Sequence, residues 1–327
     1  MIVRDKIKYY LKNNKAIYNF FRVLYSSITH PNRLMKKKSF GEDNPDQTLL
    51  IIRPNSEDGV QGLMSLFVQA ARWMQYAKEH NYKTFVDYKT YKTQYYDGEN
   101  NSWEFFFKQP DDIQYEDVYN SKNVILSGVA LGDTTDDMLF REYVFRDKDN
   151  LRKCHDLLEN SIRLTDEVSQ IVDQENEILH VEDCIGVYIR GTDYAKLKPT
   201  GEFRQPEIQE VCDEIREFVN RYPGKKVFLV TEDDEYHKKI QEEFPELLTT
   251  VSFDSFIKGY DGKGYLSKSG LLDGDKKKRG IDYLVKIILL SRCRYLISSI
   301  TMGSIAAYSF NGGKYEDEYI FELGYYE

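Results

Sequence analysis

Residues 184–230 contain the pattern that decides the fold. They include two apolar runs, CIGVYIR at residues 184–190 and KVFLV at residues 226–230. Between these runs, IQEVCDEIREFVNRY at residues 208–222 repeats its apolar side chains every three or four positions, as an amphipathic helix does. The order of strand, helix and strand predicts a β-α-β unit in a parallel sheet that has helices on both faces.

The same alternation continues toward the C-terminus. Further elements are expected, in order, as a helix at 234–244, a strand at 251–253, a long loop at 254–280, a helix at 281–290, a strand at 295–297 and a helix at 304–310. In open sheets of this kind, ligands bind beyond the carboxyl ends of the strands. The residues that directly follow each strand are therefore the candidates for function.

A second β-α-β unit precedes the first. Its expected elements are a strand at 49–52, a helix from Leu63 to His80, a strand at 84–86 and a further strand at 123–127, and helical spacing returns at 147–172. Two such halves predict an α/β chain with two Rossmann-like domains, at 46–175 and 180–327, that face a cleft.

The N-terminus is strongly basic. Residues 1–38 contain ten lysines and arginines and one acidic residue, whereas the whole chain has a net charge of −9. Their apolar side chains follow helical spacing, so residues 1–40 are expected to form a basic amphipathic helix. Such a helix suits an anionic membrane surface, or it packs on the acidic body of its own chain.

Composition excludes several classes of protein. With 327 residues, 41% of them hydrophobic and 30% charged, the chain is globular and long enough for about two domains. Its net negative charge disfavours a general nucleic-acid binder. The start lacks the apolar core of a secretory signal, which predicts a cytoplasmic protein. The four cysteines and five histidines are scattered, so neither disulfides nor a metal motif is predicted.

Three groups of polar residues follow the predicted strands of the second half. After 184–190, Arg190 can offer two parallel N–H donors to a diphosphate, Gly191 allows close approach, and Asp193 can fix the arginine. The alternative is a simple salt bridge at the strand end. The other groups are Thr231, Glu232, Asp233 and Asp234, and Ser298, Ser299 and Thr301. Their alternative role is helix N-capping, which is favoured for Asp233 and Asp234.

Motifs of other enzyme classes are absent from the sequence. It has no G-x-x-x-x-G-K-[ST] and no strand-linked G-x-G-x-x-G. Neither a P-loop hydrolase nor a dinucleotide dehydrogenase is therefore supported.

Taken in order, the three groups resemble the fucosyltransferase superfamily of α1,6-fucosyltransferases and protein O-fucosyltransferases. The likeness is strongest to bacterial O-fucosyltransferase-like proteins of surface-polysaccharide gene clusters. It rests on YIRGTD at 188–193, VTED at 230–233, and LLSRC at 289–293 followed by YLISS at 295–299. In the first half it rests on DGVQGL at 58–63, where relatives place a loop under the donor sugar.

The resemblance implies a GT-B architecture, GDP-fucose as donor, inversion at the anomeric carbon, and neither a metal nor a cofactor. It implies that 46–175 is the acceptor-side domain and that 180–327 binds the nucleotide sugar. Arg190 would bind the diphosphate, and Asp193 and Glu202 are the candidates for a general base. The expected nucleotide-sugar-binding residues are Gly59, Val60, Gln61, Tyr188, Arg190, Thr231, Glu232, Asp233, Ser298, Ser299 and Thr301.

The chain departs from the family pattern at three positions. Tyr188 replaces the usual histidine, Gly191 replaces a second arginine, and Lys286 replaces a helix aspartate that touches the base. Asp282, one turn before Lys286, is expected to pair with it. Because of these departures, the identity of the sugar-nucleotide donor stays open.

The leading hypothesis is an inverting, metal-independent fucosyltransferase in bacterial surface polysaccharide synthesis. It would act on a glycan or lipid-linked glycan at the inner face of the membrane. One alternative is a metal-dependent glycosyltransferase that uses another sugar nucleotide, with residues 232–234 as its acidic motif. The other is a non-catalytic subunit that binds a glycan or nucleotide within a polysaccharide assembly complex.

Overall fold

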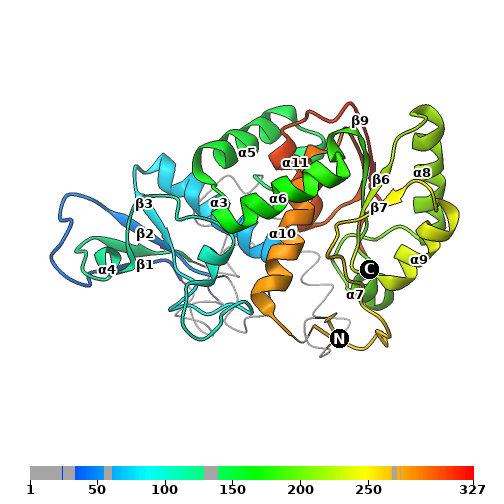
Figure 1. Ribbon diagram of the computed structural model, residues 1–327. Coiled ribbons are helices and arrows are strands. Elements are labelled where there is room, and N and C mark those ends of the chain that lie inside the picture. Colours follow the sequence, from blue (N-terminus) through cyan, green and yellow to red (C-terminus); the bar gives the residue numbers. More distant parts are fainter. Residues whose placement is uncertain (1–23, 25–33, 55–60, 129–138, 267–270, 273) are drawn as a thin grey trace.

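The chain forms two β-sheets on either side of a group of central helices (Figure 1). The computed structural model describes residue 24 and residues 34–54, 61–128, 139–266, 271–272 and 274–327. The expected amphipathic helix lies almost entirely outside the described residues. Among the described residues, no helix is both long and apolar enough to span a membrane.

The first sheet has the order β1-β4-β2-β3. Its strands are β1 (Lys36–Lys38), β2 (Leu49–Ile52), β3 (Lys83–Val86) and β4 (Val124–Leu126). Strand β2 pairs in parallel with both β3 and β4, whereas β1 pairs antiparallel with β4. The predicted β-α-β unit is confirmed, but this sheet is mixed rather than purely parallel.

Strand β1 corrects the prediction that residues 1–40 are helical. Since β2 occupies only one edge of β4, residues 36–38 pair with the other edge and satisfy its backbone groups. Three successive lysines contribute little apolar surface but suit the edge of a sheet, where charge opposes pairing with other chains.

The second sheet is entirely parallel and has the order β7-β6-β5-β8-β9. Its strands are β5 (Ile185–Tyr188), β6 (Val227–Val230), β7 (Leu248–Thr249), β8 (Tyr295–Ser299) and β9 (Asp317–Phe321). Ile185 and Val187 pack toward α8 (Ile208–Arg221) and α9 (Asp234–Glu243), whereas Tyr188 belongs to the core on the opposite face. The predicted α/β class is therefore confirmed.

The strand expected at 251–253 is wrong, because this segment forms a turn and β7 ends before it. Glu175, on helix α6 (Asp166–Leu179), accepts hydrogen bonds from the backbone N–H of Ser252, at 2.8 Å, and from its hydroxyl. These bonds hold the segment to a helix and remove it from the sheet.

Helix α10 (Lys276–Arg292) also begins earlier than predicted, because the Asp275 side chain accepts a hydrogen bond from the backbone of Lys278 and caps it. The other helices are α3 (Leu63–Glu79), α4 (Tyr115–Val118), α5 (Lys148–Ser161), α7 (Thr192–Leu197) and α11 (Met302–Asn311), with 3-10 helices at Ser102–Phe105, Glu142–Phe145 and Val181–Asp183.

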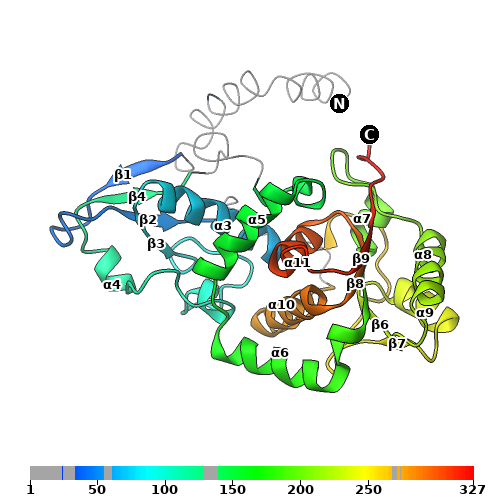
Figure 2. The ribbon, with the colours of Figure 1, turned by 90° about the horizontal axis from the view of Figure 1, so that it is seen from above.

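Helices α3, α10 and α11 lie between the two sheets (Figure 2). One cluster of buried apolar side chains runs from Leu50 and Ile52 of β2 through these helices to Phe228 of β6. Within it, the rings of Phe67 on α3 and Phe310 on α11 stack with their centroids 5.3 Å apart. Apolar packing therefore joins the sheets, while the cleft and the domain boundaries stay predictions.

A buried ion pair links α10 to the segment after β7. Lys286 pairs with Asp254, and their side chains are 11% and 3% exposed. The expected pair between Asp282 and Lys286 is wrong, because Asp282 pairs with Lys278 at 2.6 Å, one turn earlier. Lys286 thus neutralises a carboxylate that the fold has removed from water.

Replacing Lys286 with methionine should lower the free energy of unfolding by about 3–5 kcal/mol, because Asp254 is left as an unpaired buried charge. Lys278→Met is the matched control, since it breaks a more exposed lysine–aspartate pair on the same helix and should cost less than about 1 kcal/mol. Urea unfolding of both variants measures the difference. Equal losses of unfolding free energy in the two variants would show that burial does not make the Lys286–Asp254 pair more important than the exposed pair.

Candidate functional site

The second sheet has a topological switch point beside β5. The chain leaves β5 for β6 on one side, whereas β8 pairs with β5 on the other. A crevice for a ligand is therefore expected beyond the carboxyl ends of β5 and β8. Arg190 follows the first of these strands and Thr301 follows the second. The geometry places these two predicted site residues at the two sides of the switch point.

The turn after β5 is strained. Thr192 has φ of 43°, in the left-handed region that β-branched residues rarely adopt. Its backbone N–H donates to Asp233 Oδ2 at 2.6 Å, and its hydroxyl donates to Glu232 Oε1 at 2.9 Å. Two acidic residues at the end of β6 thus hold the turn in a conformation that the chain alone disfavours. Such strain occurs often at functional sites.

Arg190 lies at the centre of this polar cluster. Its guanidinium stacks over the Tyr194 ring, 4.3 Å from the centroid. It also lies 3.4 Å from Asp193 Oδ1 and 3.8 Å from Glu232 Oε1. Burial opposes the positive charge, but the carboxylates of Glu232 and Asp193 outweigh it and raise the pKa of Arg190. Since 31% of its side chain is exposed, an anion in the crevice can reach the guanidinium.

The acidic partners of Arg190 have different surroundings. Asp193 is buried, and its second oxygen accepts a hydrogen bond from the backbone of Leu266 at 3.0 Å. Burial raises the pKa of Glu232, although the charge of Arg190 opposes the shift. Both carboxylates therefore support Arg190 and the strained turn.

Glu202 is exposed in the loop after α7. Burial raises the pKa of Tyr194 to about 12, and the charge of Glu202 adds to this effect while that of Arg190 opposes it. The charge of Glu202 therefore acts on Tyr194, the residue whose ring lies against Arg190.

Three of the predicted binding residues accept hydrogen bonds from backbone N–H groups of the protein itself. Asp233 caps α9 by accepting bonds from the backbone of Glu235 and Tyr236, and Thr301 caps α11. The buried hydroxyl of Thr231 accepts from the backbone of Asp233 at 3.2 Å. The alternative role as helix N-caps thus holds for Asp233 and Thr301.

The buried hydroxyls beside β5 and β8 are also engaged within the protein. Ser298 donates to the Tyr188 carbonyl at 3.3 Å, and Ser299 donates to Gln205 Oε1 at 2.6 Å. The Tyr188 hydroxyl lies 3.0 Å from that of Tyr283 on α10. These hydroxyl groups therefore lie in a network of internal hydrogen bonds at the carboxyl ends of β5 and β8.

The loop predicted to lie under the donor sugar is only partly described. Gly59 and Val60 lie outside the described residues. Gln61 precedes α3, and its carbonyl accepts a hydrogen bond from the Gln94 side chain at 2.6 Å.

The sequence did not single out Tyr194, Tyr283 or Gln205 as members of this cluster. Tyr194 directly follows Asp193 in the segment after β5, so the rule that marks residues beyond the carboxyl ends of strands also covers it. Tyr283 and Gln205 reach the cluster through tertiary packing alone, so no local pattern marks them.

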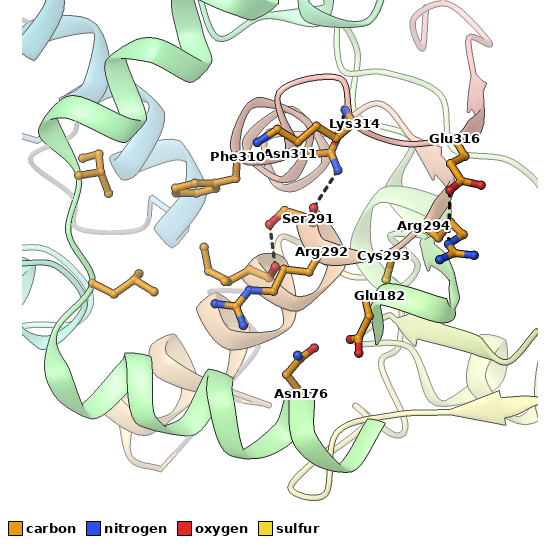
Figure 3. Close-up of a pocket in the computed structure, with 13 residues that line it drawn as sticks. Asn176, Glu182, Ser291, Arg292, Cys293, Arg294, Phe310, Asn311, Lys314 and Glu316 are labelled. Atoms are coloured by element: carbon orange, nitrogen blue, oxygen red, sulfur yellow. Dashed lines mark hydrogen bonds and ion pairs between the residues drawn. The ribbon is translucent and has the colours of Figure 1, made fainter. Parts of the chain in front are cut away.

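A separate hollow of about 720 Å³ lies between α6, the end of α10 and the end of α11. Figure 3 shows Asn176, Arg292, Phe310 and Lys314 around it. Arg294, which also lines it, directly precedes β8. The hollow is therefore at the amino ends of the strands, on the opposite edge of the sheet from Arg190.

The turn at Gly191 has no room for a side chain. A Cβ atom at this position would lie 2.4 Å from the Cβ of Asp233. The carboxylate that holds Thr192 therefore explains why glycine stands where the family pattern has a second arginine.

We expect Gly191→Ala to lower the free energy of unfolding by about 1–3 kcal/mol, because displacing Asp233 weakens both the α9 cap and its bond to Thr192. Gly62→Ala is the control, since a Cβ there meets nothing within 4 Å. Chemical denaturation of the two variants provides the comparison, and a Gly191→Ala protein as stable as the control would rule out the steric conflict.

No protein-family model matches the chain, and neither does any curated protein sequence. Solved structures do match it. POFUT1 in complex with GDP has a TM-score of 0.52 and 9% identity over 84% of this chain and 98% of its own. The fucosyltransferase NodZ from Bradyrhizobium has a TM-score of 0.47 and 18% identity, covering 80% of this chain and 92% of its own. FUT1 of Arabidopsis thaliana, in complex with GDP, has a TM-score of 0.47 and 12% identity, covering 86% and 71%. The likeness to POFUT1 shows that this chain and POFUT1 share a fold.

Proposed function

We propose that this protein is an inverting, metal-independent glycosyltransferase that transfers fucose from GDP-fucose to a hydroxyl of a glycan or glycolipid. The observation that carries the proposal is Arg190, a partly exposed cation at the switch point of a parallel sheet. The fold is shared with POFUT1, whose structure contains GDP. A nucleoside diphosphate bound in the crevice would bring its phosphates to this guanidinium.

Arg190 would stabilise the leaving group. As the bond between the anomeric carbon and the diphosphate oxygen breaks, its electron pair goes to GDP, and negative charge grows on the phosphate. A fixed guanidinium that is held by Asp193, Glu232 and Tyr194 needs no reorganisation to meet that charge. Asp193 therefore acts as a positioning residue in this proposal. Of the two candidates for a general base, Glu202 is the one that we retain.

The acceptor hydroxyl would attack the anomeric carbon from the face opposite to GDP. Its oxygen forms the new bond, inversion follows, and its proton passes to a base. Glu202 suits this role, because it is exposed and its loop directly follows α7, the helix that carries Tyr194.

The acids at 232–234 do not suit a shared metal. Glu232 accepts from Thr192, Asp233 caps α9, and Asp234 pairs with Lys238 at 2.6 Å. Each carboxylate thus has its own protein partner, and the positive charge at the leaving group comes from Arg190.

We further propose that the acceptor is an intermediate of bacterial surface polysaccharide synthesis at the inner face of the membrane. The ten lysines and arginines of residues 1–38 support this, because basic segments bind anionic lipid surfaces.

A thermal shift measurement with GDP, GDP-fucose and UDP, with and without EDTA, tests the proposal. A ligand that binds only the native state adds about 2.7 kcal/mol of stability at 100 times its Kd. We expect stabilisation by GDP and GDP-fucose that persists in EDTA and is lost in Arg190→Ala. Arg216→Ala, which removes an exposed arginine paired with Asp213 and Glu243, should keep it.

Transfer of fucose to a glycan acceptor is then measured directly. A preference for UDP, or a requirement for a divalent metal, would contradict the proposal and favour a different glycosyltransferase. GDP binding without any turnover in the presence of acceptors would favour a non-catalytic subunit.

A further inference from the structure

The loop that carries Glu202 is held by the segment after β9. The backbone of Gly201 donates to the carbonyl of Tyr326, and the backbone of Tyr326 donates to the carbonyl of Glu202, both at 2.9 Å. The backbone of Arg204 donates to the carbonyl of Gly324, also at 2.9 Å. Residues 201–204 and 324–326 thus form a short antiparallel pair.

This pairing is the main attachment of the loop. Helix α7 ends at Leu197, and Lys198 then adopts φ of 47°, which turns the chain away from the helix. Within the described part of the chain, the backbone bonds that tie 199–204 to distant residues all run to 324–326. The rings of Phe203 and Tyr325 stack across the pair at 4.5 Å.

Two further hydrogen bonds connect the same loop to the end of β8. The Tyr326 hydroxyl accepts a hydrogen bond from the backbone of Gln205 at 3.0 Å. Gln205 is 7% exposed, and its side-chain oxygen accepts from the Ser299 hydroxyl at 2.6 Å. Ser299 is the last residue of β8. Tyr326, Gln205 and Ser299 therefore link the end of β8 to the loop that carries Glu202.

We infer that Tyr326 and Gln205 are positioning residues that hold the loop on which Glu202 is carried. The inference rests on the proposed function, in which Glu202 accepts the proton of the acceptor hydroxyl. Neither residue needs to touch the substrate. A carboxylate on a loose loop occupies its productive position for only a fraction of the time, so the chemical step slows while donor binding at Arg190 is unaffected.

The test uses Tyr326→Phe, which removes the acceptor of the Gln205 N–H, and Gln205→Met, which breaks the bond to Ser299. Tyr319→Phe is the matched control, because it makes the same chemical change on exposed β9 outside this network. Hydrogen exchange measured at the amides of Gly201 and Arg204 reports on the loop without reference to activity. We expect exchange at both amides to quicken by about tenfold or more in the two variants and to stay unchanged in the control.

Steady-state kinetics test the consequence for transfer. We expect kcat to fall by about tenfold to 100-fold in both variants. KM for GDP-fucose and the thermal shift with GDP should remain as in the unaltered protein. A merely structural role would instead lower the melting temperature and weaken GDP binding together.

Coupling to Glu202 is measured in a double-mutant cycle. In a Glu202→Gln background, Tyr326→Phe should cause no further loss of kcat, because the group that it positions is already disabled. Additive losses, or unchanged exchange at Gly201 and Arg204, would overturn the inference. If the unaltered protein transfers no fucose, the proposed function fails, while hydrogen exchange still decides whether the network holds the loop.

Discussion

The bond from the backbone N–H of Thr192 to the Asp233 carboxylate is the contact on which the candidate site depends. It holds a β-branched residue in the left-handed region and sets the direction in which the chain leaves β5. That direction carries Asp193 and Tyr194 back beside Arg190. The same carboxylate caps α9, so the end of one strand, the start of one helix and the position of the cation are fixed together.

The charged side chains of the cluster surround a single cation, Arg190. The hydroxyl groups nearby have a different role. Two carboxylates raise the pKa of Arg190 against the opposing effect of burial, and the ring of Tyr194 lies against the face of the guanidinium. Most hydroxyl groups that the sequence placed near a ligand are bonded within the protein. Their contribution is rigidity, which keeps the cation in one place as charge develops on a leaving group.

Local periodicity was sufficient to predict β5, α8 and β6 around Arg190, because buried parallel strands and amphipathic helices differ in their apolar spacing. It did not predict the short helix α7 or the strand β9. It was not sufficient where contacts with residues distant in the sequence decide the local structure. Lys36–Lys38 becomes a strand only because β4 has a free edge, and Ser252 leaves the sheet because Glu175 binds its backbone. The pairing rule within a helix favoured Asp282 for Lys286, but Asp254 from another segment takes that place. Thr192 is likewise strained by residues that follow β6.

The apolar cluster that runs from β2 to β6 limits how the molecule can move. Hinging the two sheets apart would separate packed surfaces such as the Phe67 and Phe310 rings, at a cost of about 25 cal/mol for each Å² of apolar surface exposed to water. A ligand at Arg190 would therefore have to enter and leave without a large movement of one sheet against the other.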